Sequence, residues 1–141
     1  MDVHSKETRS YNMSRIRGKN TKPEELVRKH LFSLGFRYRK NDKRYPGTPD
    51  IVLPRYKTVI FVNGCFWHGH SGCKYFVVPK SNTEFWKNKI AVNIARDNEK
   101  IAQLRRMNWK VITVWECELK PKQRSETLTR LVQQIREPAD R

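Results

Sequence analysis

Three cysteines and one histidine have the types and spacing of a metal-binding site. Cys65, His70 and Cys73 lie close together in one Gly/His/Cys-rich segment, and Cys117 follows a predicted strand much later in the chain. Three thiolates and one imidazole form a closed tetrahedral ligand set for Zn²⁺, and closed sites of this kind are structural rather than catalytic. A metal ion would anchor a short loop that could hardly fold around its own polar groups. We therefore predict a structural zinc site.

Two alternatives to this ligand set stay open. His68 competes with His70 as the imidazole ligand because it lies at close spacing. Alternatively, the three thiols are ordinary buried cysteines beside an unrelated histidine. The small, odd number of cysteines argues for a reducing compartment and against a disulfide framework.

A carboxylate and a histidine indicate a second site. Asp50 opens an apolar run, and Val62 and Asn63 end the next apolar run, just before His68. A carboxylate at the mouth of a buried strand can hold a hard divalent cation, which can organise phosphodiester cleavage. The imidazole of His68 titrates near neutrality, as general acid or base work requires. The alternative is that Asp50 only caps the proline-rich turn before it.

Two further acidic residues have alternative roles. Asp97 shares the apolar stripe of a predicted helix, so its carboxylate needs a partner. That partner is either His68, whose ring it would orient, or a neighbouring basic residue, Lys100 or Arg96. Glu24 either faces the metal or completes a capping box at a helix start. The apolar stripe consists of Ile90, Ile94, Ile101 and Leu104.

Large aromatic residues stand in exposed contexts on a basic chain. Phe66 and Trp67 lie between glycines in the predicted loop, and Trp86 lies in the first turn of the long helix. Aromatic side chains on loops can stack on bases or insert between them, although Phe and Trp are more often core residues. Both Phe66 and Trp67 cannot easily point inward, so we expect at least one to be exposed.

Hydrophobic patterning predicts the elements that must position these residues. A helix is expected to start at Thr21–Glu24, with Thr21 as cap and Gly35 as stop, and another to run from the capping-box signal at Ser81–Glu84 to about Met107. The expected strands are a half-exposed one at 36–40, two adjacent central ones at 50–53 and 58–62, and one at 110–115; a final helix is expected at 125–136. This order predicts an α/β sandwich around a mixed central sheet.

Length and charge limit the classes of protein. The 141 residues suit one domain, which we place at residues 21–141, preceded by a flexible basic arm at residues 1–20. The net charge of +16 implies a polyanionic partner that contacts much of one face. No apolar stretch is long enough to span a bilayer and no secretory signal is recognisable, so we expect a cytoplasmic protein without a membrane partner.

Several short motifs of this sequence occur together in one known family. They are Pro49-Asp50, Asn63-Gly64-Cys65-Phe66-Trp67-His68, Thr83-Glu84-Phe85-Trp86, Asn93 to Asp97 and Val114-Trp115-Glu116-Cys117. Through them the chain closely resembles the very short patch repair (Vsr) endonucleases, from about Thr8 to Leu119.

The resemblance implies a restriction-endonuclease-like, PD-(D/E)xK-related fold and Mg²⁺-dependent nicking 5′ to the thymine of a T:G mismatch. Such mismatches arise when 5-methylcytosine deaminates. Implied partners are mismatched double-stranded DNA, other mismatch-repair proteins and a linked DNA-cytosine methyltransferase, with bacterial nucleoid association on DNA.

The resemblance also implies roles for single residues. Asp50 and the backbone carbonyl of Val62 would ligate Mg²⁺, and His68 would be the catalytic imidazole with Asp97 as its partner. The implied zinc ligands are Cys65, His70, Cys73 and Cys117. The implied DNA contacts are a wedge of Phe66, Trp67 and Trp86, with Met13 of the arm approaching from the opposite groove and Lys89 and Asn93 reading the mismatched pair.

Two departures from the family pattern affect these expectations. Asn63 stands where the best-known member has histidine, and an amide cannot shuttle protons near neutral pH, so more acid or base work would fall on His68. The loop from His68 to Cys73 is one residue longer than in that member. This difference affects the assignment of His70 as a zinc ligand. As in the family generally, no lysine follows Asp50 at the usual E-x-K spacing. Phe61-Val62-Asn63 stands at that place in the sequence. Alternatives are a Vsr-like nuclease with another target and a non-cleaving zinc-stabilised DNA-binding module.

Overall fold

The fold is a four-stranded mixed sheet with helices on both faces. A computed structural model describes residues 21–138. The predicted arm at residues 1–20, including Met13, lies outside the described residues. The strands are β1 (Arg39–Lys40), β2 (Ile51–Leu53), β3 (Thr58–Asn63) and β4 (Lys110–Trp115), in the spatial order β1-β2-β3-β4. β1 and β3 run antiparallel to β2, whereas β4 runs parallel to β3. The prediction of a mixed sheet with β2 and β3 at its centre is confirmed.

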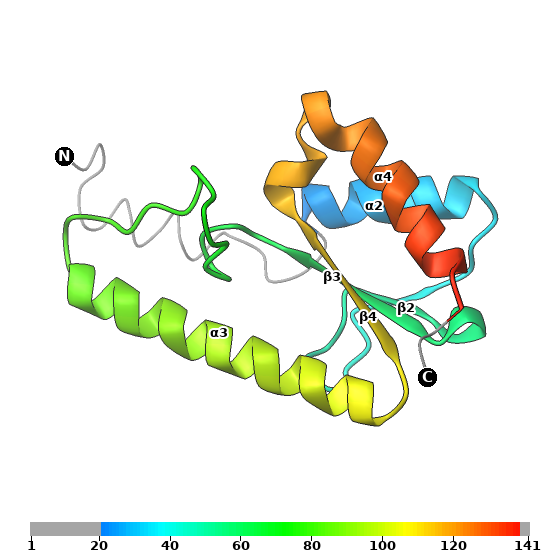
Figure 1. Ribbon diagram of the computed structural model, residues 1–141, viewed down its shortest axis with the longest axis horizontal. Helices are drawn as coiled ribbons and strands as arrows, with labels where there is room; N and C mark the ends of the chain where they lie inside the picture. Colours follow the sequence, from blue (N-terminus) through cyan, green and yellow to red (C-terminus); the bar gives the residue numbers. More distant parts are fainter. Residues whose placement is uncertain (1–20, 139–141) are drawn as a thin grey trace.

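Three helices form the outer layers. α2 (Lys22–Ser33) and α4 (Pro121–Arg136) pack together on one face of the sheet, and α3 (Thr83–Arg106) crosses the other face (Figure 1). Side chains alternate along β3 accordingly: Ile60 and Val62 pack toward α2 and α4, whereas Val59 and Phe61 pack toward α3. Burial on both faces explains why the two central strands are nearly continuous apolar runs.

Several element boundaries differ from the predictions for local reasons. The predicted strand at 36–40 is reduced to Arg39–Lys40, because the backbone of Phe36 bonds back to Leu31 and its ring enters the core. α4 begins at Pro121 rather than Ser125, because proline suits the first helical position. Two short 3₁₀ helices complete the connections: η1 (Pro54–Tyr56) joins β2 to β3, and η2 (Glu116–Leu119) joins β4 to α4.

The two predicted capping boxes have different outcomes. The Thr21 hydroxyl caps α2 by accepting a hydrogen bond from the Glu24 N–H. The predicted start of α3 is confirmed, but its cap is not the predicted one. Asn82 takes a left-handed conformation without a side-chain cap bond, and the Thr83 hydroxyl donates to the carbonyls of Pro79 and Lys80.

The N-terminal half of α3 extends beyond the sheet and is covered by the loop from Gly64 to Asn82 (Figure 1). Ile94 was predicted on the apolar stripe but is 37% exposed, because no strand lies beneath it. Gly69 contacts the helix at this point: a Cβ atom there would approach Ile94 Cδ1 to 2.7 Å and Ile90 Cγ2 to 2.8 Å. Its φ of +60° is a second reason for glycine.

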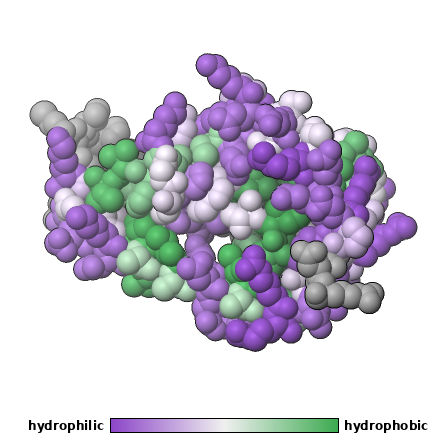
Figure 2. All heavy atoms as spheres, in the orientation of Figure 1, coloured by the Kyte–Doolittle hydropathy of each residue, from purple (hydrophilic) through white to green (hydrophobic). Residues whose placement is uncertain are grey.

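The surface is largely polar, with apolar residues exposed in more than one region. Figure 2 shows hydrophobic side chains over the loop and the N-terminal part of α3, and a hollow between this part and the rest of the molecule. Within residues 21–138, no helix is long and apolar enough to cross a membrane.

Candidate active site and metal-binding cluster

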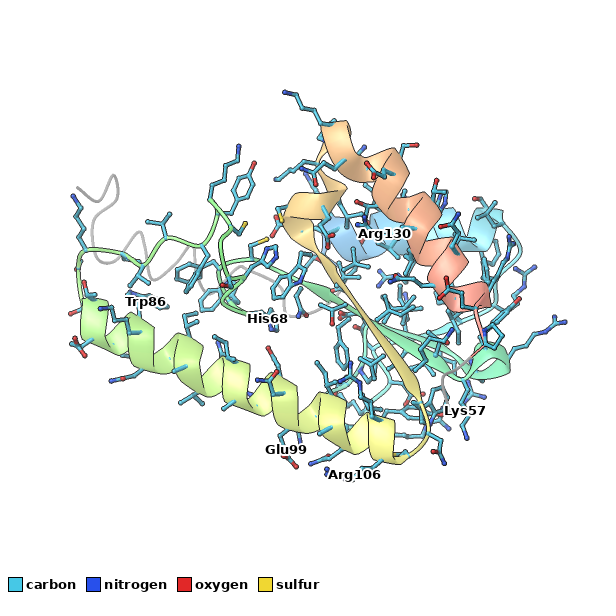
Figure 3. The ribbon with its side chains drawn as sticks, viewed as in Figure 1. Lys57, His68, Trp86, Glu99, Arg106 and Arg130 are labelled. Carbon is cyan, nitrogen blue, oxygen red and sulfur yellow. The ribbon has the colours of Figure 1, made fainter. Side chains whose placement is uncertain are left out.

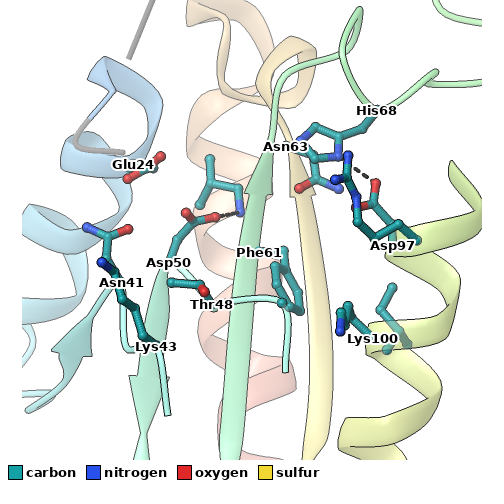
Figure 4. A pocket seen from close by; sticks show the side chains of 14 residues that line it. Glu24, Asn41, Lys43, Thr48, Asp50, Phe61, Asn63, His68, Asp97 and Lys100 are labelled. Atoms are coloured by element: carbon teal, nitrogen blue, oxygen red, sulfur yellow. Dashed lines mark hydrogen bonds and ion pairs between the residues drawn. The ribbon is translucent and has the colours of Figure 1, made fainter. Parts of the chain in front are cut away.

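A cavity of about 570 Å³ lies between α2, the sheet and α3. It brings together the acidic residues and the histidine that the sequence indicated: Glu24, Asp50, Asn63, His68 and Asp97 all line it (Figure 4). These residues come from separate segments of the chain. The fold therefore brings Asp50, His68 and Asp97 into one cavity, as the sequence predicted.

Asp50 stands at the start of β2 with one oxygen held in place. Its Oδ2 accepts a hydrogen bond of 2.6 Å from the backbone N–H of Val62 on the neighbouring strand β3. The N–H and C=O of one strand residue point to the same side of the strand. The Val62 carbonyl is thus on the Asp50 side of β3, where it could serve as an oxygen ligand for a cation.

A second carboxylate, that of Glu24, faces Asp50. Glu24 is only 3% exposed, and its Oε2 lies 3.3 Å from the guanidinium of Arg28 one turn later in α2. Glu24 lines the cavity while its backbone N–H donates to the Thr21 hydroxyl, so it lies both at the helix start and beside the predicted metal position. Burial, together with the nearby charge of Glu24, raises the pKa of Asp50 to about 7 against a hydrogen bond from Val62 that lowers it. Two facing carboxylates, of which Asp50 has a raised pKa, fit a divalent cation that would offset the charge of both.

His68 and Asp97 form a close side-chain pair in the cavity. The Nδ1 atom of His68 lies 2.6 Å from Oδ2 of Asp97, and both side chains are about one-third exposed, at 33% and 30%. Asp97 therefore pairs with His68 rather than with Lys100 or Arg96. Because an ionised carboxylate only accepts hydrogen bonds, Nδ1 carries the proton and Nε2 of the neutral ring is free to accept one.

The metal-binding cluster lies at the other end of the same loop. Ligand atoms of Cys65, His70, Cys73 and Cys117 all lie within 4.8 Å of one another. His70 directs Nδ1 toward Sγ of Cys117 at 3.4 Å, and its ring stacks on Trp115 at 4.1 Å between centroids. His68 lies outside this group. The set could hold a metal ion such as zinc, and it ties the loop to the end of β4.

The protonation of the thiols is consistent with a site completed by a cation. Burial raises the pKa of Cys65 to about 12, so its thiol is protonated at neutral pH in the absence of a metal. A bound Zn²⁺ would stabilise the thiolate and reverse this effect, since metal binding releases the proton.

Aromatic residues form one cluster beside the cavity, which we call the aromatic cluster: Phe66, Trp67, Phe76, Phe85 and Trp86. Phe66, Trp67 and Trp86 lie with ring centroids 5.2 to 5.8 Å apart and are all partly exposed. Figure 3 shows Trp86 at the N-terminal end of α3, with His68 on the loop above the helix. We expected at least one of Phe66 and Trp67 to be exposed, and both are partly exposed.

The residues expected to read base pairs differ in their surroundings. Lys89 is exposed on α3, whereas Asn93 is only 8% exposed. The Asn93 amide donates to the Trp67 carbonyl at 2.9 Å and accepts from Arg96. In this structure Asn93 thus fixes the loop on α3, and any contact with DNA stays a prediction.

Sequence reasoning missed the cations of the cavity and the buried partner of Glu24. Lys43, Arg96 and Lys100 line the cavity, and only two of them were considered, as partners of Asp97. The i,i+4 spacing of Glu24 and Arg28 was a usable signal for the ion pair. Nothing in the spacing of Lys43 or Lys100 placed them beside Asp50, because those contacts depend on the packing of α3.

A pair of facing carboxylates and an imidazole paired with a third carboxylate, in one cavity of a strongly basic chain, are groups that a hydrolytic nuclease would use. The comparisons with known proteins identify the family. Residues 1–74 match DNA mismatch endonuclease Vsr. The E. coli protein named DNA mismatch endonuclease Vsr is 43% identical over 130 residues, covering 91% of this chain and 83% of its own. This chain therefore belongs to the Vsr family of DNA mismatch endonucleases.

Other similar proteins carry a different description. A protein of Neisseria meningitidis serogroup A named type II nicking enzyme V.NmeAIP is 56% identical over 137 residues, covering 96% of this chain and 97% of its own. The type II nicking enzyme V.XorIIP of Xanthomonas oryzae is 51% identical over 118 residues, covering 84% and 86%. The similarity thus extends over nearly the whole chain.

Replacing Asp50 with Asn should stabilise the metal-free site in a pH-dependent way. The folded pKa of about 7 exceeds the ordinary value of 3.8, so the folded state binds more protons between these pH values and stability falls as pH rises through them. Because Asn cannot ionise, we expect the free energy of unfolding of Asp50→Asn to exceed that of the wild type by at least about 1 kcal/mol at pH 8. At pH 5 we expect a much smaller difference. Urea unfolding without added Mg²⁺ measures this, with Asp97→Asn as control. A gain of equal size at both pH values would contradict it.

The metal-binding cluster should contain one zinc ion that stabilises the fold. We expect Cys117→Ser to lose the metal and to lower the free energy of unfolding by about 3 kcal/mol or more, since a structural metal binds only the folded chain. His68→Ala should retain the metal, because His68 lies outside the cluster. Metal analysis and thermal melting of the purified variants check both expectations. Loss of zinc from His68→Ala but not from His70→Ala would overturn the assignment.

Proposed function

We propose that this chain nicks one strand of duplex DNA, 5′ to the thymine of T:G mismatches that arise from deamination of 5-methylcytosine. The observation that carries the proposal is the cavity in which Asp50 and Glu24 face each other while Asp97 orients His68. Family membership supports a mismatch endonuclease, and the mixed sheet with an acidic residue at a strand end supports a restriction-endonuclease-like fold.

The acidic pair would hold Mg²⁺. The oxygen ligands available are the carboxylates of Asp50 and Glu24 and the backbone carbonyl of Val62, and oxygen is the ligand type that Mg²⁺ prefers. When bound, Mg²⁺ supplies a positive charge that lowers the pKa of water and offsets charge on the phosphate. The chain's own contribution is to hold Asp50 in place through the Val62 N–H, at 2.6 Å.

His68 would handle the proton of the attacking water. Its Nδ1 is occupied by Asp97, so Nε2 can accept a proton as water adds to phosphorus and the bond to the leaving sugar oxygen breaks. Asn63 lines the same cavity and is 8% exposed. Its amide can orient a water or a phosphate oxygen but cannot take up the proton, which leaves this work to His68.

The aromatic cluster would enter the DNA stack beside the mismatch. Phe66, Trp67 and Trp86 are partly exposed rings next to the cavity, and the first two lie on the loop that also carries His68. Unstacking costs least at a mismatched pair, which would favour binding there. A zinc ion in the metal-binding cluster would fix the loop that bears both the rings and the imidazole.

A second candidate is a Vsr-like nuclease with a different DNA target. Two relatives, at 56% and 51% identity, are named type II nicking enzymes rather than mismatch endonucleases. Under either candidate, a linked DNA-cytosine methyltransferase and other mismatch-repair proteins are proposed partners.

Nicking of a panel of duplexes tests the proposal. We expect the wild-type chain with Mg²⁺ to nick only the thymine strand of T:G duplexes, in a subset of sequence contexts, and not to nick without Mg²⁺. Asp50→Ala should lower the rate roughly 100-fold or more while mismatch binding is retained, because the variant lacks a proposed metal ligand. Equal cutting of matched duplexes would favour the second candidate. Intact DNA throughout would reject a nuclease function.

Trp67→Ala should weaken mismatch preference more than general DNA affinity. Stacking of a base on an aromatic ring is worth about 1–3 kcal/mol, so we expect roughly a 10-fold or greater loss of affinity for T:G duplexes and little change for matched ones. Titration of labelled duplexes measures both. Phe32→Ala removes a 56% exposed ring on α2, outside the aromatic cluster, and serves as control. Equal losses on matched and mismatched duplexes for Trp67→Ala would contradict the wedge.

A further inference from the structure

The charged residues that line the cavity differ in whether they have a hydrogen-bond or ion-pair partner. The acidic residues have partners: Glu24 lies beside Arg28, Asp50 accepts from Val62, and Asp97 pairs with His68. Among the basic residues, Arg96 donates to Asn93 and Lys43 is exposed on a loop. The remaining cation among the described lining residues is Lys100, on α3 one turn after Asp97 (Figure 4).

The stem of Lys100 is confined by the turn before β2. A Cβ atom added to Gly47 would lie 3.1 Å from Cβ of Lys100 and 3.2 Å from Cζ of Phe61, so the helix, the turn and β3 meet closely here. The φ of Gly47 is +76°, which glycine adopts without strain. The side chain of Lys100 is consequently half-buried and begins from a fixed point.

The ammonium group of Lys100 has no counter-ion in the part of the chain that the structure describes. Across residues 21–138 it makes neither a hydrogen bond nor an ion pair, whereas Asp97, one turn earlier, is paired with His68. Lys100 is half-buried and lines the cavity, and its charge is not offset by any acidic side chain among the described residues. A lysine that lines a cavity in this state fits an anionic ligand.

Strand β3 supplies no cation to the cavity. Its lining residues are Phe61, Val62 and Asn63, of which only Asn63 has a polar side chain, and this is a neutral amide. A positive charge from the described lining residues that meets a phosphate in the cavity must come from the helix or from the loop before β2. Of these groups, only Lys100 combines partial burial, a fixed stem and an unpaired ammonium.

We propose that Lys100 binds a non-bridging oxygen of the scissile phosphate and stabilises the charge that grows there during cleavage. The inference rests on the proposed function. As the water oxygen bonds to phosphorus, the bond to the leaving sugar oxygen breaks, His68 takes the water proton and solvent water protonates the leaving oxygen. Negative charge on the non-bridging oxygens increases meanwhile, and a charge-assisted hydrogen bond from an ammonium is stronger for that state.

Lys100→Met tests the role because methionine keeps an unbranched apolar stem and removes the charge. We expect the single-turnover nicking rate at saturating T:G duplex and Mg²⁺ to fall roughly 10- to 100-fold. Lys100→Arg should recover the rate to within about 5-fold of wild type, since the charge returns. Lys87→Met removes the same charge from an exposed position of α3 and should leave the rate unchanged. Thermal melting of each variant verifies folding.

A duplex with a neutral methylphosphonate at the nicking position separates contact from indirect effects. In Mg²⁺-free buffer, wild type should bind the phosphate duplex more tightly than the methylphosphonate duplex by several-fold, whereas Lys100→Met should bind both alike, as expected for a directly coupled pair. Full nicking by Lys100→Met, or an unchanged preference in the methylphosphonate comparison, would overturn the role of Lys100 and leave the proposed function intact. Failure of the wild type to nick any duplex would overturn both.

Discussion

The contact between His68 and Asp97 is the interaction on which the site depends. It joins the loop after β3 to the middle of α3 across a gap of 2.6 Å between Nδ1 and Oδ2. Gly69 packs directly on Ile90 and Ile94 beside it, and Asn93 bonds to the carbonyl of Trp67. These contacts share one short stretch of helix, so the imidazole and the aromatic cluster are positioned by the same surface. The metal-binding cluster fixes the other end of the loop to the end of β4.

The two acidic residues Asp50 and Glu24 are positioned in a different way from His68. Asp50 and Glu24 are held close together by strands and a helix that are packed in the main core, and burial together with their repulsion raises the pKa of Asp50. Arg28 offsets part of this charge from within α2. Such an arrangement costs stability in the absence of a cation and is tolerated where it serves a function. The rigid sheet thus places the acidic pair, while the anchored loop places the imidazole of His68.

A basic chain whose cavity contains both carboxylates and cations can attract DNA over its surface, but a phosphate that enters the cavity meets charges of both signs. The net charge of +16 favours contact with the duplex over a wide surface and carries no sequence information. Discrimination would then lie in the aromatic cluster, whose partly exposed rings lie on the loop that carries His68 and at the start of α3. Membership of the Vsr family agrees with this separation of general DNA contact from recognition of the target. The type II nicking relatives show that closely similar chains carry more than one description.

The sequence by itself determined the two adjacent central strands, the long helix and the three cysteines of a cluster that could hold a metal ion, because these follow from local periodicity and from residue types that few other roles require. It left open whether Asp97 meets His68 or a neighbouring base such as Lys100, how close Glu24 lies to Asp50, and which histidine joins the cysteines. Only the tertiary structure decided these points, because each depends on how α3 and the loop pack across the sheet, and spacing along the chain carries no information about contacts between elements that are distant in sequence.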